Sequence, residues 1–262
     1  MQIEVITQEP DSTPRPTPLL FVHGMWHAAW CWAEHFMPYF AQHGYTSYAL
    51  SLRGHGASEG RERLRWTSLA DYIADVAQVV SQIEKPPVLV GHSMGGMIVQ
   101  KYLESHQTPA AVLLGSIPRS GLIGGTLRFI RRHPLLFLKI NLTLSLIHVV
   151  STPALTREAL FSADLSQEKV EAYAARLQDE SFRAYIDAMI LNLPRPKRVA
   201  TPMLVLGASD DAFFSPGEVK RTGQAYHAQT EIFPNMAHNM MLESRWQTVA
   251  NRISGWLDEK GL

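Results

Sequence analysis

Two hydrophobic patterns alternate along the first part of the chain. Short unbroken apolar runs bounded by Gly or Pro are typical of parallel strands that are covered on both faces. Between them lie stretches with helical spacing, of which residues 69–83 are the clearest. This alternation predicts an α/β fold with a mostly parallel sheet and helices on both faces. The predicted strands are residues 18–22, 47–50, 88–90, 110–114 and 203–206.

The alternation stops in the middle of the chain. Residues 117–198 have helical and locally very apolar patterning with no strand signal, and strand patterns resume at Thr201. We therefore expect a core made of residues 1–116 and 199–262, with residues 117–198 inserted as helices between two late strands. Residues 245–257 predict a last amphipathic helix.

Composition narrows the classes of protein. The chain has 262 residues, of which 46% are hydrophobic, so a disordered protein is excluded. Its 24 basic and 24 acidic residues balance, which argues against a nucleic-acid partner. The single cysteine, Cys31, leaves no intramolecular disulfide and no cysteine-based metal cluster. We expect a reducing compartment, hence a cytoplasmic protein, and either a monomer or a homodimer.

The chain also lacks the usual signs of membrane targeting. Its first residues have no basic segment followed by an apolar one, so we expect no secretory signal. The most membrane-like stretch, residues 122–150, is interrupted by Pro134 and by four charged side chains, so we expect no stable membrane insertion.

The sharpest motif is VLVGHSMGG, residues 88–96. It places Ser93 between a predicted strand and a predicted helix, which is the context of the G-x-S-x-G nucleophile elbow. A serine on such a sharp turn is exposed above the sheet only if the residues two positions before and after it are small. Gly91 and Gly95 meet this requirement, and Gly96 lets the helix approach the strand. We expect Ser93 to be a nucleophile.

A second motif, LLFVHGMWHAAWCW, spans residues 19–32. A predicted strand ends at His23, and the turn at Gly24 lets the backbone N–H of Met25 point at a substrate oxygen. Together with the N–H of Met94, it would form an oxyanion hole. We expect Gly24, Trp26 and His27 to border the substrate pocket.

A serine nucleophile needs a base and an acid that orients the base. The acid is expected after the strand at residues 203–206, where the sequence reads GASDDAFFSP. We favour Asp211, because two phenylalanines and a proline follow it at the expected spacing, and Asp210 stays as an alternative. The base is expected in the loop after the last strand-like segment, where EIFPNMAHNMMLE contains His238. The other ten histidines precede the serine or lack a strand-end context.

With these motifs in place, the sequence resembles the α/β-hydrolase fold family. It is most similar to small esterases and lysophospholipase-like hydrolases, a group that includes plant methylesterases and hydroxynitrile lyases. VHGMWHAAWCW resembles the family's oxyanion-loop segment, LSLRGHGAS its glycine-rich loop after the next strand, and GHSMGG its elbow. GASDDAFFSP and NMAHNMMLE resemble its acid and histidine loops, so the likeness covers nearly the whole chain outside the insertion. One departure is Ser51, where many relatives carry an aspartate, and it puts a loop contact in doubt.

The resemblance implies that residues 117–198 form a lid over the active site. Their apolar residues, among them Leu135 and Leu142, can roof a hydrophobic pocket or bury a core of their own. The cations Arg128, Arg131 and Arg132 can attract an anionic headgroup or form a solvated helix face.

We expect a serine hydrolase that cleaves a carboxylic ester of a small, hydrophobic substrate without a cofactor or metal. Three alternatives stay open: acyl transfer, lyase chemistry of the hydroxynitrile type, and a slow ligand-binding or sensor protein. Such lyases depend on a pocket lysine, and the residue after His238 is Asn239, with no lysine in that loop.

Overall fold

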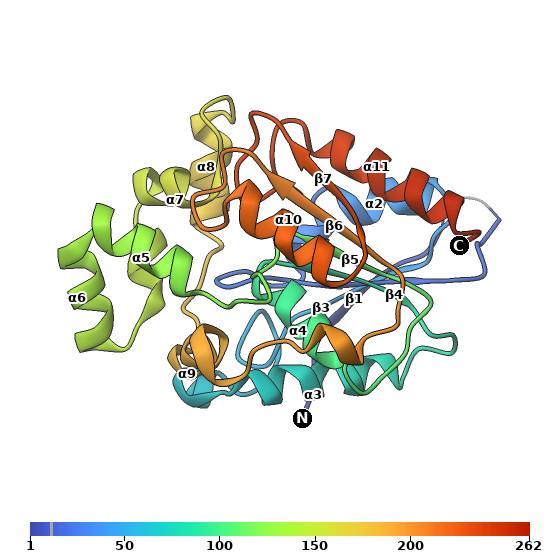
Figure 1. Cartoon of the computed structure of the whole chain (residues 1–262), viewed down its shortest axis with the longest axis horizontal. Coiled ribbons are helices and arrows are strands. Elements are labelled where there is room, and N and C mark those ends of the chain that lie inside the picture. The colour runs from blue at the N-terminus through green and yellow to red at the C-terminus, as the bar shows by residue number, and fades with distance from the viewer. Residues whose placement is uncertain (11–12) are drawn as a thin grey trace.

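A seven-stranded sheet runs through the middle of the molecule (Figure 1). The computed structural model describes residues 1–10 and 13–262. The strand order is β1-β3-β2-β4-β5-β6-β7, and all neighbours are parallel except β1, which pairs antiparallel with β3. This is the α/β-hydrolase fold that the sequence predicts. The strands are β1 (Val5–Gln8), β2 (Leu19–Val22), β3 (Ser47–Leu50), β4 (Val88–His92), β5 (Ala111–Leu114), β6 (Met203–Ala208) and β7 (Gln229–Phe233).

Five strands were expected from unbroken apolar runs, and all five are present. Strands β2, β4, β5 and β6 are buried at every position, as strands covered on both faces should be. The first strand, β1, was not predicted. It is a short edge strand with half-buried side chains, so its sequence has no continuous apolar run to mark it.

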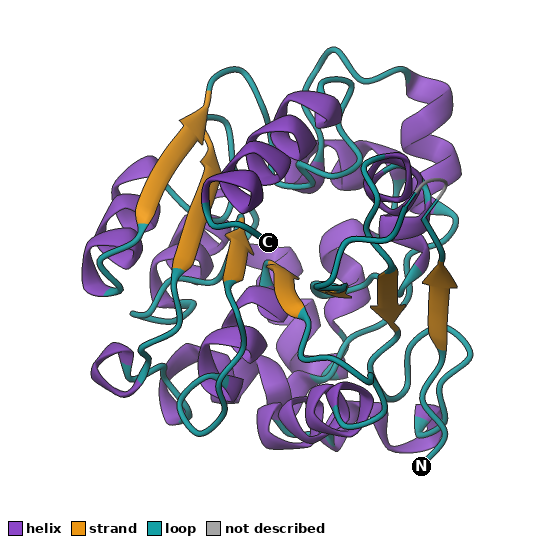
Figure 2. Cartoon of the chain, turned by 90° about the vertical axis from the view of Figure 1, so that its right-hand side faces the viewer, coloured by secondary structure: helices purple, strands orange, loops and turns teal. Residues whose placement is uncertain are grey.

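Helices cover both faces of the sheet (Figure 2). Helices α2 and α11 pack together on one face, and α3 packs against α4 on the other. The longest predicted internal helix, residues 69–83, ends earlier than expected, at Val80, and starts at a capping box between Ser68 and Asp71. The helices of the core are α1 (Trp30–Ala33), α2 (Phe36–Gln42), α3 (Leu69–Val80), α4 (Met94–Tyr102), α10 (Pro216–Ala225), α11 (Trp246–Glu259) and the short 3-10 helix η1 (Arg61–Trp66).

Residues 117–198, called the insertion below, connect β5 to β6 and contain only helices and loops. Figure 1 shows α5, α6, α7 and α8 beside one end of the sheet, with α9 near α3. No helix in the described part of the chain has the length and hydropathy of a membrane-spanning segment. The elements are α5 (Ile123–Arg132), α6 (Pro134–Thr143), η2 (Leu146–Val150), α7 (Pro153–Leu160), α8 (Gln167–Ala174), α9 (Phe182–Ile186), the π-helical turn η3 (Asp187–Leu191) and the short 3-10 helix η4 (Pro196–Arg198).

Ser51 stands where many relatives carry an aspartate, and its hydroxyl still forms a loop contact. Its buried hydroxyl donates to the carboxylate of Glu4 and accepts from the backbone N–H of Ala29 at 3.0 Å. The same Glu4 carboxylate accepts from the backbone N–H of Ala57 at 3.1 Å. A side chain from just before β1 thus holds the loop after β3.

Candidate active site

The predicted site residues meet at one edge of the sheet. Ser93 follows β4, Asp211 follows β6 and His238 follows β7. Because these strands are parallel, their carboxyl ends lie at the same edge, where ligands bind in open α/β sheets. Residues separated by more than a hundred positions in the sequence are therefore brought within hydrogen-bonding distance.

Ser93 lies on a strained turn between β4 and α4. Its φ of 52° and ψ of −117° are rare for a residue with a side chain. A Cβ at Gly91 would lie 2.6 Å from the carbonyl oxygen of Gly95, and a Cβ at Gly95 would overlap the backbone of Val22 and His23. Only glycine fits at these two positions, so the turn depends on the pattern that the sequence displays.

A hydrogen-bonded chain links three side chains. The Ser93 hydroxyl lies 3.0 Å from Nε2 of His238, and Nδ1 of His238 lies 2.8 Å from Oδ2 of Asp211. The other oxygen of Asp211 accepts from the backbone N–H groups of Phe213 and Phe214 at 2.7 and 3.0 Å. With Nδ1–H donating to Asp211, Nε2 is free to accept the serine proton.

The second candidate acid lies outside this chain. The exposed Asp210 accepts a hydrogen bond from the hydroxyl of Ser209 at 2.6 Å, and its own backbone N–H donates to the carbonyl of Met236. The two neighbouring aspartates point to different surroundings, and of the two it is Asp211 that hydrogen-bonds to His238.

Two backbone N–H groups flank the serine. Met25 follows β2 in the turn at Gly24, and Met94 is the first residue of α4. Within the described part of the chain, neither N–H donates a hydrogen bond to another residue. The free amide of Met94 also lies at the positive end of the α4 dipole. Both groups are therefore available to an anionic oxygen.

Buried histidines support this arrangement. His92 donates from Nε2 to the carbonyl oxygen of His238 at 3.0 Å. His27 donates from Nδ1 to the carbonyl of Met25 at 2.7 Å, and its Nε2 accepts from the side-chain amide of Asn239 at 3.1 Å. Burial lowers the pKa of His27 to about 4, against the raising effect of the Met25 carbonyl, so this ring is neutral at neutral pH.

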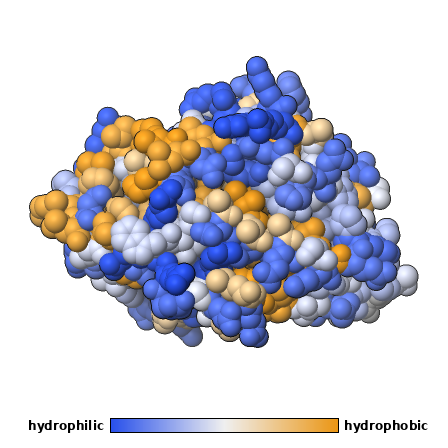
Figure 3. All heavy atoms as spheres, turned by 90° about the horizontal axis from the view of Figure 1, so that it is seen from below, coloured by the Kyte–Doolittle hydropathy of each residue, from blue (hydrophilic) through white to orange (hydrophobic). Residues whose placement is uncertain are grey.

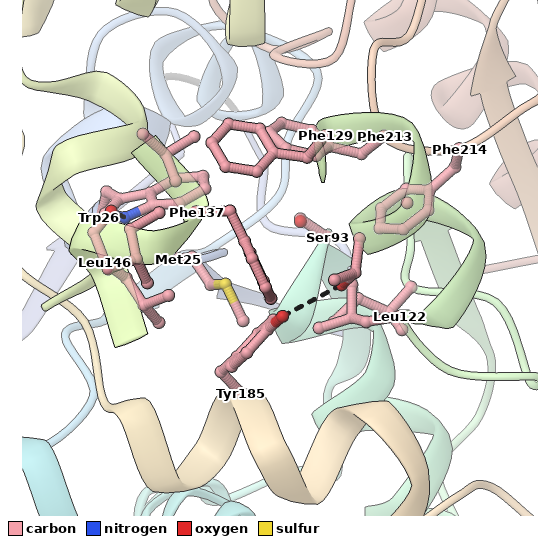
Figure 4. A pocket seen from close by; sticks show the side chains of 15 residues that line it. Met25, Trp26, Ser93, Leu122, Phe129, Phe137, Leu146, Tyr185, Phe213 and Phe214 are labelled. Atoms are coloured by element: carbon pink, nitrogen blue, oxygen red, sulfur yellow. Dashed lines mark hydrogen bonds between the residues drawn. The ribbon is translucent and has the colours of Figure 1, made fainter. Parts of the chain in front are cut away.

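An apolar pocket opens in front of Ser93 (Figure 4). Trp26 lies in its lining, as expected, but Gly24 and His27 do not. The place where a Gly24 side chain would stand is filled by Ser93 and His92, and the His27 ring is turned toward Met25 and Asn239. The core contributes Met25, Trp26, Ser93, Phe213 and Phe214, and the insertion contributes Ile117, Leu122, Gly125, Thr126, Phe129, Phe137, Ile140, Leu146, Val149 and Tyr185.

One polar pair in the pocket was not foreseen from the sequence. The hydroxyls of Thr126 and Tyr185 lie 3.1 Å apart and form the dashed contact in Figure 4. They come from α5 and α9, 59 positions apart, and no motif marks either residue. Only the packing of the insertion brings them together beside the serine.

The histidine loop is tied to the insertion as well as to the core. The backbone N–H of Asn239 donates to the carbonyl of Leu160, at the end of α7, over 3.0 Å. The buried carboxylate of Glu243 accepts from the backbone N–H of Ser162 at 2.8 Å. Burial raises the pKa of Glu243, in spite of the hydrogen bonds from Ser162 and Ala237.

The fold and the strand-end site agree with a family assignment. A family model described as the alpha/beta hydrolase family matches residues 19–252. The chain therefore belongs to the alpha/beta hydrolase family.

Individual relatives match shorter stretches. The non-heme chloroperoxidase of Streptomyces lividans is 33% identical over 105 residues, which are 38% of this chain and 37% of that protein. Protein phosphatase methylesterase 1 of Bos taurus is 35% identical over 100 residues, 37% of this chain and 26% of that protein. The chain thus matches little more than a third of these curated relatives' length at most.

Solved structures match over nearly the whole chain. The monoacylglycerol lipase of Paleococcus ferrophilus has a TM-score of 0.75 at 19% identity, covering 99% of this chain and 100% of that one. An esterase from Exiguobacterium antarcticum has a TM-score of 0.77 at 16% identity, covering 98% and 95%. At sequence identities of 19% and 16%, this similarity shows a shared fold alone.

Proposed function

We propose that the protein is a serine hydrolase that cleaves a carboxylic ester with an apolar acyl or alcohol group. The observation that carries this proposal is the hydrogen-bonded chain from Ser93 through His238 to Asp211, at the base of an apolar pocket. Two free backbone N–H groups beside the serine complete the arrangement that ester cleavage needs.

In the first half of the reaction, the Ser93 oxygen attacks the ester carbonyl carbon while its proton passes to Nε2 of His238. Asp211 holds the ring in the tautomer that accepts this proton and stabilises the imidazolium. The carbonyl oxygen becomes an oxyanion facing the N–H groups of Met25 and Met94. Each such donor typically contributes about 3 kcal/mol to transition-state stabilisation. The C–O bond then breaks, and the imidazolium returns its proton to the departing alkoxide.

In the second half, His238 takes a proton from water, whose oxygen attacks the acyl-serine carbonyl. The tetrahedral intermediate forms in the same oxyanion hole, and its collapse breaks the bond to Ser93. The proton on His238 passes to the serine oxygen, and a carboxylic acid leaves. No cofactor or metal enters this scheme.

The lining of the pocket supports an apolar substrate. Aromatic and aliphatic side chains surround the serine, and the hydroxyls of Thr126 and Tyr185 are the polar groups beside it. Ten of the lining residues belong to the insertion, which supports its role as a lid that selects the substrate. None of the described lining residues is a lysine, so we do not propose lyase chemistry.

The cysteine content bears on the compartment in which the protein works. The single cysteine, Cys31, is buried and the chain needs no disulfide, which supports work in the cytoplasm.

Acyl transfer to an alcohol would use the same acyl-serine intermediate, and water competes with that alcohol for the intermediate.

A series of 4-nitrophenyl esters from acetate to longer acyl chains tests the proposal. We expect release of nitrophenol by the wild-type protein and a preference for acyl groups longer than acetate. The matched control is Ser116→Ala, a serine close to the elbow that the mechanism does not use, and it should keep the activity. Equal rates for the wild type and Ser93→Ala would contradict the proposal.

A further inference from the structure

One face of helix α6 is apolar and uncovered. Ile140 faces inward and lines the pocket, whereas the opposite side of the helix points outward. On that side Leu135 is 81% exposed, Leu138 54% and Leu142 76%. These leucines and Lys139 lie three, four and seven residues apart, so they share one face of the helix. A helix that is apolar all round is normally buried. The α6 outer face consists of Leu135, Leu138, Lys139 and Leu142.

The segment around this face is strongly cationic. Residues 117–157 contain six basic and no acidic residues, in a chain whose formal net charge is zero. Arg131 and Arg132 end α5 directly before α6, and within the described residues neither forms an ion pair. Glu158, which accepts from His133 at 2.9 Å, lies at the edge of the segment. The six cations are Arg119, Arg128, Arg131, Arg132, Lys139 and Arg157.

The exposed apolar side chains of α5 and α6 gather at one end of the molecule. Figure 3 shows them at the left end, which is the end where α5 and α6 lie in Figure 1. On α5, Ile123 and Leu127 are also exposed, at a spacing of four residues that continues to Arg131. Apolar and cationic side chains are thus mixed on the same two helices.

We propose that the α6 outer face docks the protein on the surface of an anionic phospholipid bilayer. The leucines enter the boundary between headgroups and acyl chains, and Arg131, Arg132 and Lys139 pair with headgroup phosphates. A second copy of the chain fits this face less well. A two-fold contact would bring the same three cations against their own copies, with no carboxylate in residues 117–157 to balance them.

Docking would place the pocket beside the lipid. The inner sides of α5 and α6 contribute Thr126, Phe129 and Phe137 to the pocket lining, and their outer sides would lie on the bilayer. Two helices would then separate Ser93 from the source of an apolar ester. The inference goes beyond the proposed hydrolase function, because binding to lipid requires neither Ser93 nor turnover.

Co-sedimentation with vesicles tests this surface. The wild-type protein and Ser93→Ala are each mixed with vesicles of phosphatidylcholine alone and with vesicles that also contain phosphatidylglycerol. We expect both proteins to sediment with the anionic vesicles, less at high salt, and to stay in solution with the neutral ones. A Ser93→Ala protein that binds while the wild type shows no esterase activity would separate this inference from the proposed function.

Two triple variants locate the contact. Arg131→Gln with Arg132→Gln and Lys139→Gln should weaken binding about a hundredfold, at roughly fivefold for each cation lost near the surface. The leucine triple, Leu135→Ser with Leu138→Ser and Leu142→Ser, should weaken it more than about tenfold.

The matched control is Lys85→Gln with Lys220→Gln and Arg221→Gln, which removes three exposed cations elsewhere and should bind like the wild type. All variants should keep the thermal transition of the wild type, because the replaced side chains are exposed. Equal binding of the leucine triple and the wild type would overturn the proposal. A dimer in solution that the leucine triple converts to a monomer would overturn it too, in favour of a second copy on this face.

Discussion

The turn that carries Ser93 and the helices α5 and α6 of the insertion are held in different ways. At the turn, backbone atoms of β4, the end of β2 and α4 meet so closely that Gly91 and Gly95 cannot be replaced. Helices α5 and α6 instead contact the pocket through side chains, and the α6 outer face is uncovered. The chemistry thus rests on rigid backbone, and substrate choice rests on exchangeable side chains. Changes at the turn should have large, general effects, whereas changes in the insertion should have small, selective ones.

The two neighbouring aspartates provide the largest expected contrast. Asp211→Asn should lower kcat by about 10⁴-fold, because an amide at this position no longer holds His238 in the tautomer that accepts the serine proton. Asp210→Asn is the matched control and should change kcat less than about threefold. Steady-state kinetics on a nitrophenyl ester measures both. A larger loss for Asp210→Asn would reverse the assignment of the acid.

Two glycines test how tightly the turn is packed. Gly95→Ala should lower the free energy of unfolding by more than about 3 kcal/mol, because its Cβ would overlap backbone atoms that cannot move aside. In α11, a Cβ at Gly255 meets nothing within 4 Å, so Gly255→Ala should raise stability by about 0.5–1 kcal/mol. Urea denaturation measures both changes. Similar stability of the two variants would show that the close contacts at the turn are not restrictive.

The histidines beneath the site predict a loss of stability in acid. Burial lowers the pKa of His23, His27 and His92, with His27 at about 4. Between about pH 6.5 and 4 the unfolded chain therefore binds protons that the folded chain does not. The stabilising effect is complete above this window and is lost as the pH falls, by roughly 3 kcal/mol for His27 alone.

Urea denaturation at several pH values measures this slope. The variant His27→Gln should show a shallower fall between about pH 6.5 and 4, because one proton-linked group is removed. Its stability at neutral pH should also decrease, since the contacts with Met25 and Asn239 change. Parallel pH curves for the variant and the wild type would contradict the assignment of a neutral, buried His27.

The smallest expected effect concerns the two sides of α6. Phe137 lines the pocket, and Phe137→Ala should change the preference for a long acyl chain over acetate by about tenfold in kcat/KM. Leu135 lies on the same helix but points outward, so Leu135→Ala should leave this preference unchanged for soluble esters. A kcat/KM series over acyl chain length compares them. Equal shifts in both variants would remove the distinction between the inner and outer sides.

The turn at Ser93 and the insertion also differ in how well the sequence predicts them. Ser93, His238 and the strands that carry them are marked by local patterns, because the turn demands particular residues at fixed spacing. The spacing of the phenylalanines and the proline after Asp211 favours it over Asp210, but the alternative stays open until the directions of the two adjacent side chains are known. The pocket depends on packing between distant helices, so Tyr185 was missed and His27 was expected in the lining, although its ring is turned toward Asn239. The edge strand β1 was also missed, because its half-buried residues form no continuous apolar run.

The central claim is that Ser93 is a nucleophile activated by His238. Incubation with a fluorophosphonate probe, followed by intact-mass and peptide mass spectrometry, tests it most directly. The account predicts one probe per chain, attached to Ser93, with labelling abolished in Ser93→Ala and strongly slowed in His238→Ala. An unlabelled wild-type protein, or a probe attached at the same rate to Ser93→Ala, would contradict it.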